Sequence, residues 1–353
     1  MARKEVGFGV VGLGMGGHHC LAIDAAKGAR LAAVCDTDPE RLDTVVKRHG
    51  CRGHARYADL LKDPEVEVVS VVTESAYHAE MGIMAARAGK HLVMEKPVDI
   101  TPARMDRLER AVAAAGVKCG CVFQSRMSPV NTALKQAVDR GKLGKLIGVH
   151  AGLPWFRAPE YFLGPHGPWR GTWAVDGGGS MMNQGIHTVD LMIFLAGPVA
   201  EVFGFYGVFD HDIEAEDHAV AALRFAGGAL GTVYTTTCAR PEGGQHLFLF
   251  GSGGSFRMEG PRLSAYDAGT ARERAKMLGR FGGAAKDAAA SDAMAVATDG
   301  HTLIMADMAR AVREDREPCI PIRAARHAVE VVCAVYKAGR TGRTVKLRVP
   351  GAR

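Results

Sequence analysis

The sequence predicts an α/β protein of two domains: a doubly wound parallel sheet comes first, followed by an α+β domain with a mostly antiparallel sheet. Apolar runs and helix-like segments alternate through the first 125 residues, a pattern typical of a parallel sheet with helices on both faces. After Gly144 the apolar runs lengthen and glycine pairs separate them, as in hairpin-connected strands. We therefore predict domains over residues 1–125 and 126–353.

In the first domain, five expected strands alternate with four expected helices. One of these helices should open at Asp38, a good N-cap, with Pro39 in the first helical position. The expected strands are residues 5–11, 30–35, 66–72, 91–94 and 117–122, and the other expected helices are residues 18–27, 77–88 and 102–115.

The second domain should hold a helix at residues 129–139, then a series of strands, then two closing helices. The strands are expected at residues 145–150, 199–206, 218–225, 229–237, 246–251 and 254–259, and the closing helices at 300–313 and 323–340. Between them, residues 268–298 are rich in alanine and glycine. We expect this segment to be a partly helical insertion.

Composition excludes several classes of function. The net charge is +6 and no run of five like charges occurs, which argues against nucleic-acid binding. No apolar stretch reaches the roughly 18 residues of a membrane span, and no signal-peptide pattern is present, so we expect a cytoplasmic protein. The eight cysteines are dispersed, and no metal site is predicted from them.

The glycine-rich turn after the first strand predicts a dinucleotide-binding Rossmann domain. Gly12, Gly14 and Gly17 fit the GxGxxG pattern, with Met15 inside it. The first glycine makes the tight turn, the second admits a pyrophosphate, and the third lets helix and strand pack closely. The helix N-terminus then offers N–H groups to the phosphates.

Asp36 predicts the choice of cofactor. It ends the second expected strand, 19 residues after Gly17, close to the spacing of the acid that binds a ribose 2′-hydroxyl. A carboxylate there would repel a 2′-phosphate, so NAD is favoured over NADP.

Two polar clusters are candidates for the chemistry. Glu95 and Lys96 end the fourth expected strand, and ligands bind outside the carboxyl ends of parallel strands. Asn183 and His187 lie four residues apart and would share a helix face, with Asp190 three residues further. Histidine suits proton transfer near neutral pH, although a lone histidine on an apolar helix is often a core residue.

An aromatic segment precedes the second cluster. All three tryptophans fall within 19 residues, together with two arginines. Aromatic faces stack on sugar rings, and guanidinium groups bind hydroxyls or anions, so we predict a substrate pocket; a local satellite core is the alternative. The predicted substrate residues are Trp155, Arg157, Trp169, Arg170 and Trp173, with Asn183 and His187.

Together these motifs resemble the Gfo/Idh/MocA family, named after glucose–fructose oxidoreductase and inositol dehydrogenase. The resemblance covers nearly the whole chain. It rests on residues 12–17, 36–41, 73–78, 88–91, 95–97, 177–190, 217–218 and 339–345. It implies that the second domain carries a large open-faced sheet used for oligomer contacts, and hence a homodimer or homotetramer.

The resemblance also implies site residues. Lys96 and His187 would be the proton-transfer groups, Thr73, His78 and Glu95 would lie at the cofactor, and Glu95 would be near the nicotinamide ribose. The family often has Asp at the position of Asn183; an amide can orient the carbinol but cannot relay a proton. Glu74 follows Thr73 where the family usually has proline, a change for which we have no account.

The leading hypothesis is an NAD-dependent dehydrogenase that interconverts a secondary alcohol and a ketone on a sugar, sugar derivative or cyclic polyol. The second hypothesis is a glycosidase that retains NAD and acts through a transient ketone. The third is a non-enzymatic sugar or NAD sensor, against which the presence of both Lys96 and His187 argues.

Overall fold

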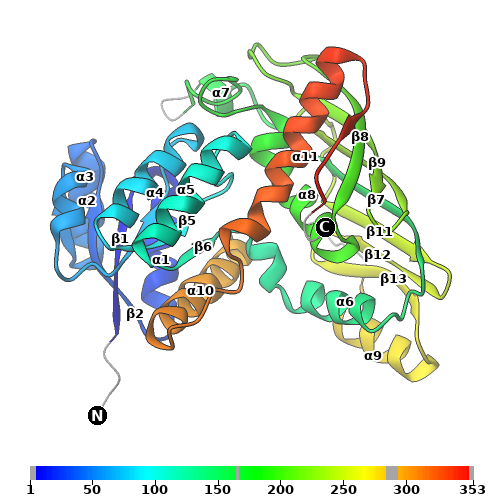
Figure 1. Cartoon of the computed structure of the whole chain (residues 1–353), viewed down its shortest axis with the longest axis horizontal. Coiled ribbons are helices and arrows are strands. Elements are labelled where there is room, and N and C mark those ends of the chain that lie inside the picture. The colour runs from blue at the N-terminus through cyan, green and yellow to red at the C-terminus, as the bar shows by residue number, and fades with distance from the viewer. Residues whose placement is uncertain (1–4, 164–166, 284–292, 350–353) are drawn as a thin grey trace. The chain divides into compact units, whose positions relative to one another are not determined.

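The computed structural model describes residues 5–163, 167–283 and 293–349, with side chains from residue 300 onward in the last range. It divides into two compact units, coloured by residue number in Figure 1. The first unit consists of Met1–Gln124 and Met294–Arg326, and the second of Ser125–Ala293 and His327–Arg353.

The first unit is built on a six-stranded sheet in which all paired strands are parallel. Its order is β3-β2-β1-β4-β5-β6. The chain winds outward from β1 in both directions, so the strand order reverses between β1 and β4 and the predicted doubly wound sheet is confirmed. The strands are β1 (Val6–Val11), β2 (Ala29–Cys35), β3 (Arg52–His54), β4 (Val68–Val71), β5 (His91–Met94) and β6 (Cys119–Cys121).

Helices flank this sheet (Figure 1). They are α1 (Leu13–Ala25), α2 (Pro39–His49), α3 (Tyr57–Lys62), α4 (His78–Arg87), α5 (Pro102–Ala115) and α10 (Ala293–Arg313). The expected start of α2 is confirmed, because the Asp38 carboxylate accepts the N–H groups of Glu40 and Arg41 and Pro39 stands in the first turn. The edge strand β3 was not predicted, since three largely exposed residues carry no apolar run.

Residues 294–326 lie in the first unit, although the sequence placed them in the second domain. The reason is the outer edge of β6, whose main-chain groups need partners. Cys121 N–H donates to the carbonyl of Ile320 at 2.8 Å, and Gly120 bridges to Pro321. The chain therefore returns to close this edge of the sheet.

The second unit carries an eight-stranded sheet of order β13-β12-β11-β7-β10-β9-β8-β14. All neighbours are antiparallel except the parallel pair β7 and β10, so the predicted mostly antiparallel sheet is confirmed. The strands are β7 (Leu146–Pro154), β8 (Val199–Gly207), β9 (His218–Phe225), β10 (Leu230–Thr236), β11 (His246–Gly251), β12 (Gly254–Glu259), β13 (Arg262–Ala268) and β14 (Val345–Lys346).

One face of this sheet is covered and the other is open. Burial alternates along β9, the signature of a strand with one packed and one solvated face. Helices α8 (Ile186–Ala196) and α11 (Ile322–Thr341) lie on the covered side (Figure 1), and an added Cβ on Gly204 of β8 would lie 3.1 Å from Val335. The other helices are α6 (Pro129–Asp139), α7 (Glu160–Leu163) and α9 (Ala271–Phe281).

The alanine- and glycine-rich segment has a defined start. Thr270 and Glu273 form a capping box at the N-terminus of α9, which satisfies the first N–H groups of the helix. Residues 284–292 of this segment lie outside the described part of the chain. None of the described helices is long and apolar enough to cross a membrane.

Candidate functional site

The glycine-rich turn lies between β1 and α1. Gly12 has φ 85°, and an added Cβ would lie 2.5 Å from the carbonyl oxygen of Val72, so only glycine fits. An added Cβ at Gly14 would have no neighbour within 4 Å, which leaves room for a ligand. An added Cβ at Gly16 would lie 3.0 Å from the Val10 side chain, whereas one at Gly17 would have no neighbour within 4 Å. The close packing of helix on strand is therefore at Gly16 and not, as the pattern suggested, at Gly17.

Asp36 lies directly beside this turn. Its carboxylate accepts the N–H of Leu13 at 2.6 Å and the N–H of Asp38 at 2.8 Å, and Arg41 approaches it at 3.3 Å. Leu13 is the first residue of α1, and Met15 in the same turn is exposed. The open space at Gly14, the N-terminus of α1 and the Asp36 carboxylate fit a dinucleotide, with the carboxylate placed for a ribose hydroxyl.

Glu95, at the end of β5, is held by two histidines that the sequence did not connect to it. Its Oε1 faces His19 Nε2 at 3.0 Å and His301 Nε2 at 3.5 Å, and its Oε2 accepts the Lys96 N–H at 2.6 Å. Burial alone would raise the pKa of Glu95, but the two histidines and the charge of Lys96 hold it well below its usual range. The carboxylate thereby fixes the main chain at Lys96.

The loop at Thr73 is tied to the turn after Lys96. His78 is buried, and its ring nitrogens face the carbonyl oxygens of Pro97 at 2.7 Å and Thr73 at 2.8 Å. The Lys96–Pro97 peptide bond is cis. His78 therefore positions two loops, and its ring nitrogens are turned to the protein's own main chain.

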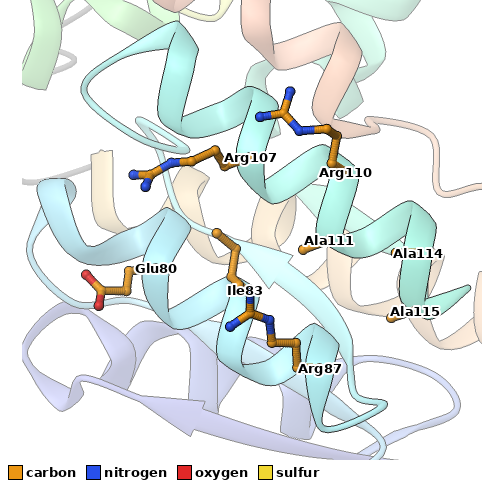
Figure 2. Close-up of a pocket in the computed structure, with 8 residues that line it drawn as sticks. All are labelled: Glu80, Ile83, Arg87, Arg107, Arg110, Ala111, Ala114 and Ala115. Carbon is orange, nitrogen blue, oxygen red and sulfur yellow. The ribbon is translucent and has the colours of Figure 1, made fainter.

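A shallow pocket of about 790 Å³ lies elsewhere on the first unit, between α4 and α5 (Figure 2). Arg87, Arg107 and Arg110 line it, with Ile83 and alanines of α5. None of the residues that line it belongs to the glycine turn or to the end of β5. This pocket is thus separate from the candidate cofactor site.

In the second unit the expected single helix over Asn183 and His187 is replaced by two segments. A π-helical turn covers Ser180–Gln184, and α8 begins at Ile186. Asp190 does not join this cluster, because it forms a buried two-bonded ion pair with Arg126 at 2.8 and 2.6 Å.

Glu216 fixes the N-terminal end of the π-helical turn through its carboxylate. Its carboxylate accepts the N–H groups of Gly179 and Met181, both at 2.7 Å, and the Tyr336 hydroxyl at 2.9 Å. An added Cβ at Gly179 would lie 1.9 Å from the carbonyl oxygen of Glu216. Burial raises the pKa of Glu216 to about 7. Sequence reasoning missed this residue because its partners lie far away along the chain.

The amide of Asn183 is oriented by a carboxylate that the sequence did not reveal. Its Nδ2 donates to the buried Asp176 at 2.7 Å. The Tyr161 hydroxyl donates to Asn183 Oδ1 at 3.4 Å and accepts from Gln184 Nε2 at 2.6 Å. Asn183 and His187 are both half-buried, so both remain reachable by a substrate.

The aromatic segment separates into two groups. Trp155 and Trp169 lie near arginines, with Arg157 Cζ 4.5 Å from the Trp155 ring centroid and Arg170 Cζ 5.7 Å from that of Trp169. Trp173 instead packs edge-on against Tyr336 and Tyr206, with ring centroids 5.0 and 5.6 Å away. Its surroundings are those of a local core.

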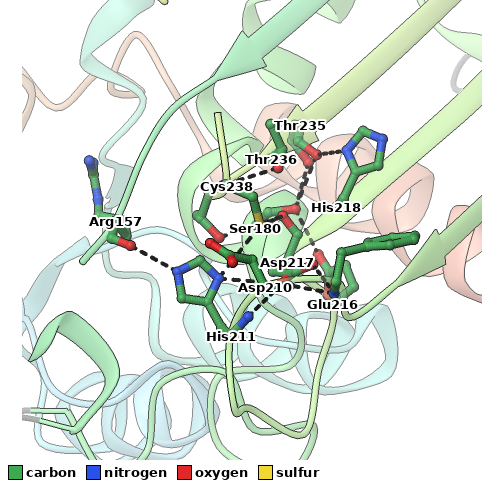
Figure 3. A network of polar contacts seen from close by, with 12 residues as sticks. Arg157, Ser180, Asp210, His211, Glu216, Asp217, His218, Thr235, Thr236 and Cys238 are labelled. Carbon is green, nitrogen blue, oxygen red and sulfur yellow. Dashed lines mark hydrogen bonds and ion pairs between the residues drawn. The ribbon is translucent and has the colours of Figure 1, made fainter. Parts of the chain in front are cut away.

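A polar network lies behind Arg157 (Figure 3). His211 Nε2 faces the Arg157 carbonyl oxygen at 2.8 Å, and His211 Nδ1 faces Asp217 at 3.3 Å and Cys238 Sγ at 3.6 Å. The Asp217 carboxylate also accepts the N–H groups of residues 209–211. These contacts fix the loop and, through it, the main chain of Arg157.

The structure thus brings together two trios of metal-ligand type from distant parts of the chain. They are His19 with Glu95 and His301, and His211 with Asp217 and Cys238. The sequence gives no sign of either trio, since their members are not closely spaced. In both, the hydrogen bonds just described account for the arrangement without an ion.

Comparisons with known proteins match both units. Residues 6–123 match a family model described as an oxidoreductase family with an NAD-binding Rossmann fold, and residues 131–257 match the GFO/IDH/MocA C-terminal domain. Myo-inositol 2-dehydrogenase of Thermotoga maritima is 30% identical over 256 residues, 70% of this chain and 73% of the relative. The NAD⁺-dependent scyllo-inositol 2-dehydrogenase of Bacillus subtilis is 26% identical, covering 65% of this chain and 67% of its own.

A solved structure matches nearly the whole chain. The WlbA dehydrogenase of Bordetella pertussis, in complex with NADH and UDP-GlcNAcA, is 30% identical with a TM-score of 0.85. The match covers 98% of this chain and 100% of that one. Levoglucosan dehydrogenase in complex with NADH and levoglucosan, at 20% identity and a TM-score of 0.83, shares the fold.

Proposed function

The chain belongs to the Gfo/Idh/MocA family of NAD-binding oxidoreductases, and from this we propose that it interconverts a secondary alcohol and a ketone on a sugar, sugar derivative or cyclic polyol. The relatives named above include two inositol dehydrogenases and a dehydrogenase solved in complex with UDP-GlcNAcA. The observation that carries the proposal is the half-buried pair Asn183 and His187 in a chain that also has the glycine turn of a dinucleotide site. Asn183 lies on the turn that Glu216 holds, with its amide bonded to Asp176, and His187 lies in the first turn of α8.

NAD, when bound, supplies the hydride acceptor. Gly12 and Gly14 would receive its pyrophosphate at the N-terminus of α1, and Asp36 its adenosine ribose. The open position at Gly14 is the feature that supports this fit, because a side chain there would fill the approach.

The protein's own groups handle the proton. Loss of hydride from a carbinol carbon requires that a proton leave its oxygen, and we assign this transfer to His187 and Lys96. Asn183 hydrogen-bonds the carbinol, with its amide oriented by Asp176. The Glu95 carboxylate, which accepts the Lys96 N–H, holds the main chain from which that side chain extends.

We infer further that copies of the chain associate through the open face of the large sheet. Phe205 of β8 is 61% exposed and Leu230 of β10 is 55% exposed. Val220 of β9 pairs directly with Phe205 and is exposed as well. Exposed apolar side chains on three consecutive strands, two of them directly paired, favour a contact surface.

The test is to purify the protein without added cofactor, identify any dinucleotide released on denaturation, and titrate the apo protein with NAD and NADP. Tight and preferential NAD binding supports the proposal and justifies a sugar and polyol screen. Bound NAD that does not exchange, with release of a glycosyl leaving group and no net NADH, would favour the glycosidase hypothesis. Failure to bind either dinucleotide would contradict the proposal.

A further inference from the structure

Two guanidinium groups of the second unit lie beside one tyrosine ring. Arg170 Cζ is 4.1 Å and Arg157 Cζ is 5.6 Å from the ring centroid of Tyr161. Arg157 also lies over Trp155 and Arg170 beside Trp169. Stacking holds the flat faces of the guanidinium groups and leaves their N–H edges to bind other groups.

Neither guanidinium group has a carboxylate of the described residues within 4 Å, although the charge of the exposed Glu242 attracts Arg157 from farther away. Arg157 donates to the carbonyl oxygen of Phe156 at 2.9 Å and to Gln184 Oε1 at 3.3 Å, while Arg170 donates to the carbonyl oxygen of Tyr161 at 3.1 Å. All these acceptors are neutral. Burial lowers the pKa of Arg157, which shows that its charge is held at a cost in solvation.

Other half-buried arginines of the chain are paired with carboxylates. Arg126, for example, forms a two-bonded pair with Asp190. Arg240 also stacks on an aromatic ring, with Cζ 4.1 Å from the Phe156 centroid, and it has Asp210 at 3.5 Å. Arg157 and Arg170 therefore differ from the other half-buried arginines that the structure describes, each of which has a carboxylate within 4 Å.

The arginine pair is connected to the residues assigned to the reaction. Tyr161, on which both guanidinium groups stack, donates its hydroxyl to Asn183, and Gln184 bonds to both Tyr161 and Arg157. The same substrate can therefore contact the arginines and the carbinol-orienting amide.

Arg157 is also held in place from behind. Its N–H donates to the carbonyl oxygen of Thr237 at 2.8 Å, and its own carbonyl oxygen is bonded by His211, which is braced by Asp217 (Figure 3). A fixed main chain lowers the entropy lost when the guanidinium group binds a ligand.

We propose that Arg157 and Arg170 form an anion subsite that selects a substrate with a carboxylate or phosphate group on its sugar. The inference rests on the proposed function of the same site and names its substrate class. An anion there would receive charge-assisted, forked hydrogen bonds, stronger than those to a neutral hydroxyl.

The test measures binding to the NAD-saturated protein by calorimetry, with three hexoses that differ in charge: glucose, glucuronate and glucose 1-phosphate. We expect at least one anion to bind about 10–100-fold more tightly than glucose. Preference for glucuronate identifies a carboxylate and preference for glucose 1-phosphate a phosphate. Equal binding of all three, or binding of none, overturns the proposal.

Substitutions of the arginines test whether the anion preference depends on Arg157 and Arg170. Arg157→Met and Arg170→Met keep apolar bulk on the rings and should each abolish most of the anion preference, with unchanged NAD affinity. Arg157→Lys retains the charge and should keep part of the preference, which a folding defect would not. Arg240→Met, a stacked arginine that already has an acidic partner, is the matched control and should change nothing.

The outcomes separate this inference from the proposed reaction. An anion preference that depends on the arginines, without NADH formation from any sugar, supports the subsite and contradicts the oxidoreductase proposal. NADH formation from neutral and anionic sugars at equal rates, unchanged in both methionine variants, supports the reaction and overturns the subsite.

Discussion

At the scale of single residues, the proton-transfer groups are the most direct prediction. Lys96→Ala and His187→Ala should each lower kcat by roughly 10²–10⁴-fold, because proton transfer is lost. NAD affinity should change little, since neither side chain belongs to the glycine turn. Steady-state kinetics and NAD titration measure both quantities. Lys47→Ala, on the exposed face of α2, is the control; near-full activity in either test variant would remove that residue from the assignment.

Asp36 is predicted to set the cofactor preference. Asp36→Ala removes the carboxylate beside Leu13 and should lower the affinity for NAD by roughly tenfold or more. The difference in affinity between NAD and NADP should become smaller, because the carboxylate no longer repels the 2′-phosphate of NADP. Parallel titrations with the two dinucleotides give the ratio. Asp43→Ala, an exposed residue of α2, should leave it unchanged. An unaltered NAD/NADP ratio in the Asp36 variant would place the ribose elsewhere.

At the scale of elements, the turn Ser180–Gln184 should make stability depend on pH. Burial raises the pKa of Glu216 to about 7, above its ordinary value of 4.5. The folded state thus binds this proton more tightly than the unfolded state. Its contribution to the free energy of unfolding is full below pH 4.5 and falls as the pH rises through about 7.

The measurement is urea unfolding at about pH 5 and about pH 8, for the wild type and Glu216→Gln. The glutamine cannot ionise, so the loss of stability between the two pH values should be smaller in the variant. Absolute stability falls in the variant because one acceptor is lost, and the difference between pH values is therefore the readout. Equal differences in the two proteins would mean that Glu216 does not titrate in this range.

Helix α1 provides a second prediction at this scale. Gly16→Val should destabilise the protein by about 1–3 kcal/mol, because even an added Cβ at this position would lie only 3.0 Å from Val10. Gly17→Ala meets no neighbour and should be neutral or stabilising by up to about 1 kcal/mol through helix propensity. Thermal unfolding of the apo protein compares them, and equal damage by both variants would refute the assignment of the packing position to Gly16.

At the scale of the whole molecule, the open sheet face should set the oligomeric state. Phe205→Glu and Leu230→Glu place charges on exposed apolar positions of β8 and β10, the two strands that flank β9, and should shift a dimer or tetramer toward monomer. Light scattering after gel filtration gives the mass. A wild-type protein that is already monomeric, or variants that remain assembled, would show that this face is not the contact.

The sequence was most informative where a property is local. The β-branched runs, the Asp38 cap and the glycine turn depend on neighbours in the chain, and they predicted both sheets. Partners far apart in the chain could not be predicted from the sequence. No residue near Glu95 indicates its contact with His301, and none near Asn183 identifies Asp176 as the acceptor of its amide.

The domain boundary shows the same limit. The segment 294–326 has ordinary helical periodicity, which says nothing about which sheet it joins. Its place in the first unit depends on the unpaired edge of β6, a consequence of strand order. Likewise the π-helical turn at Ser180–Gln184 follows from its bonds to Glu216 and was not foreseen from the glycine run.

The central claim is that this protein carries out NAD-linked oxidation of a sugar or polyol carbinol. The most direct test is NADH formation, followed by absorbance, when the NAD-loaded protein is offered neutral and acidic sugars and cyclic polyols beside His187→Ala. We predict NADH formation with at least one of them in the wild type and its near loss in the variant. NAD binding without NADH formation from any of these compounds would contradict the claim.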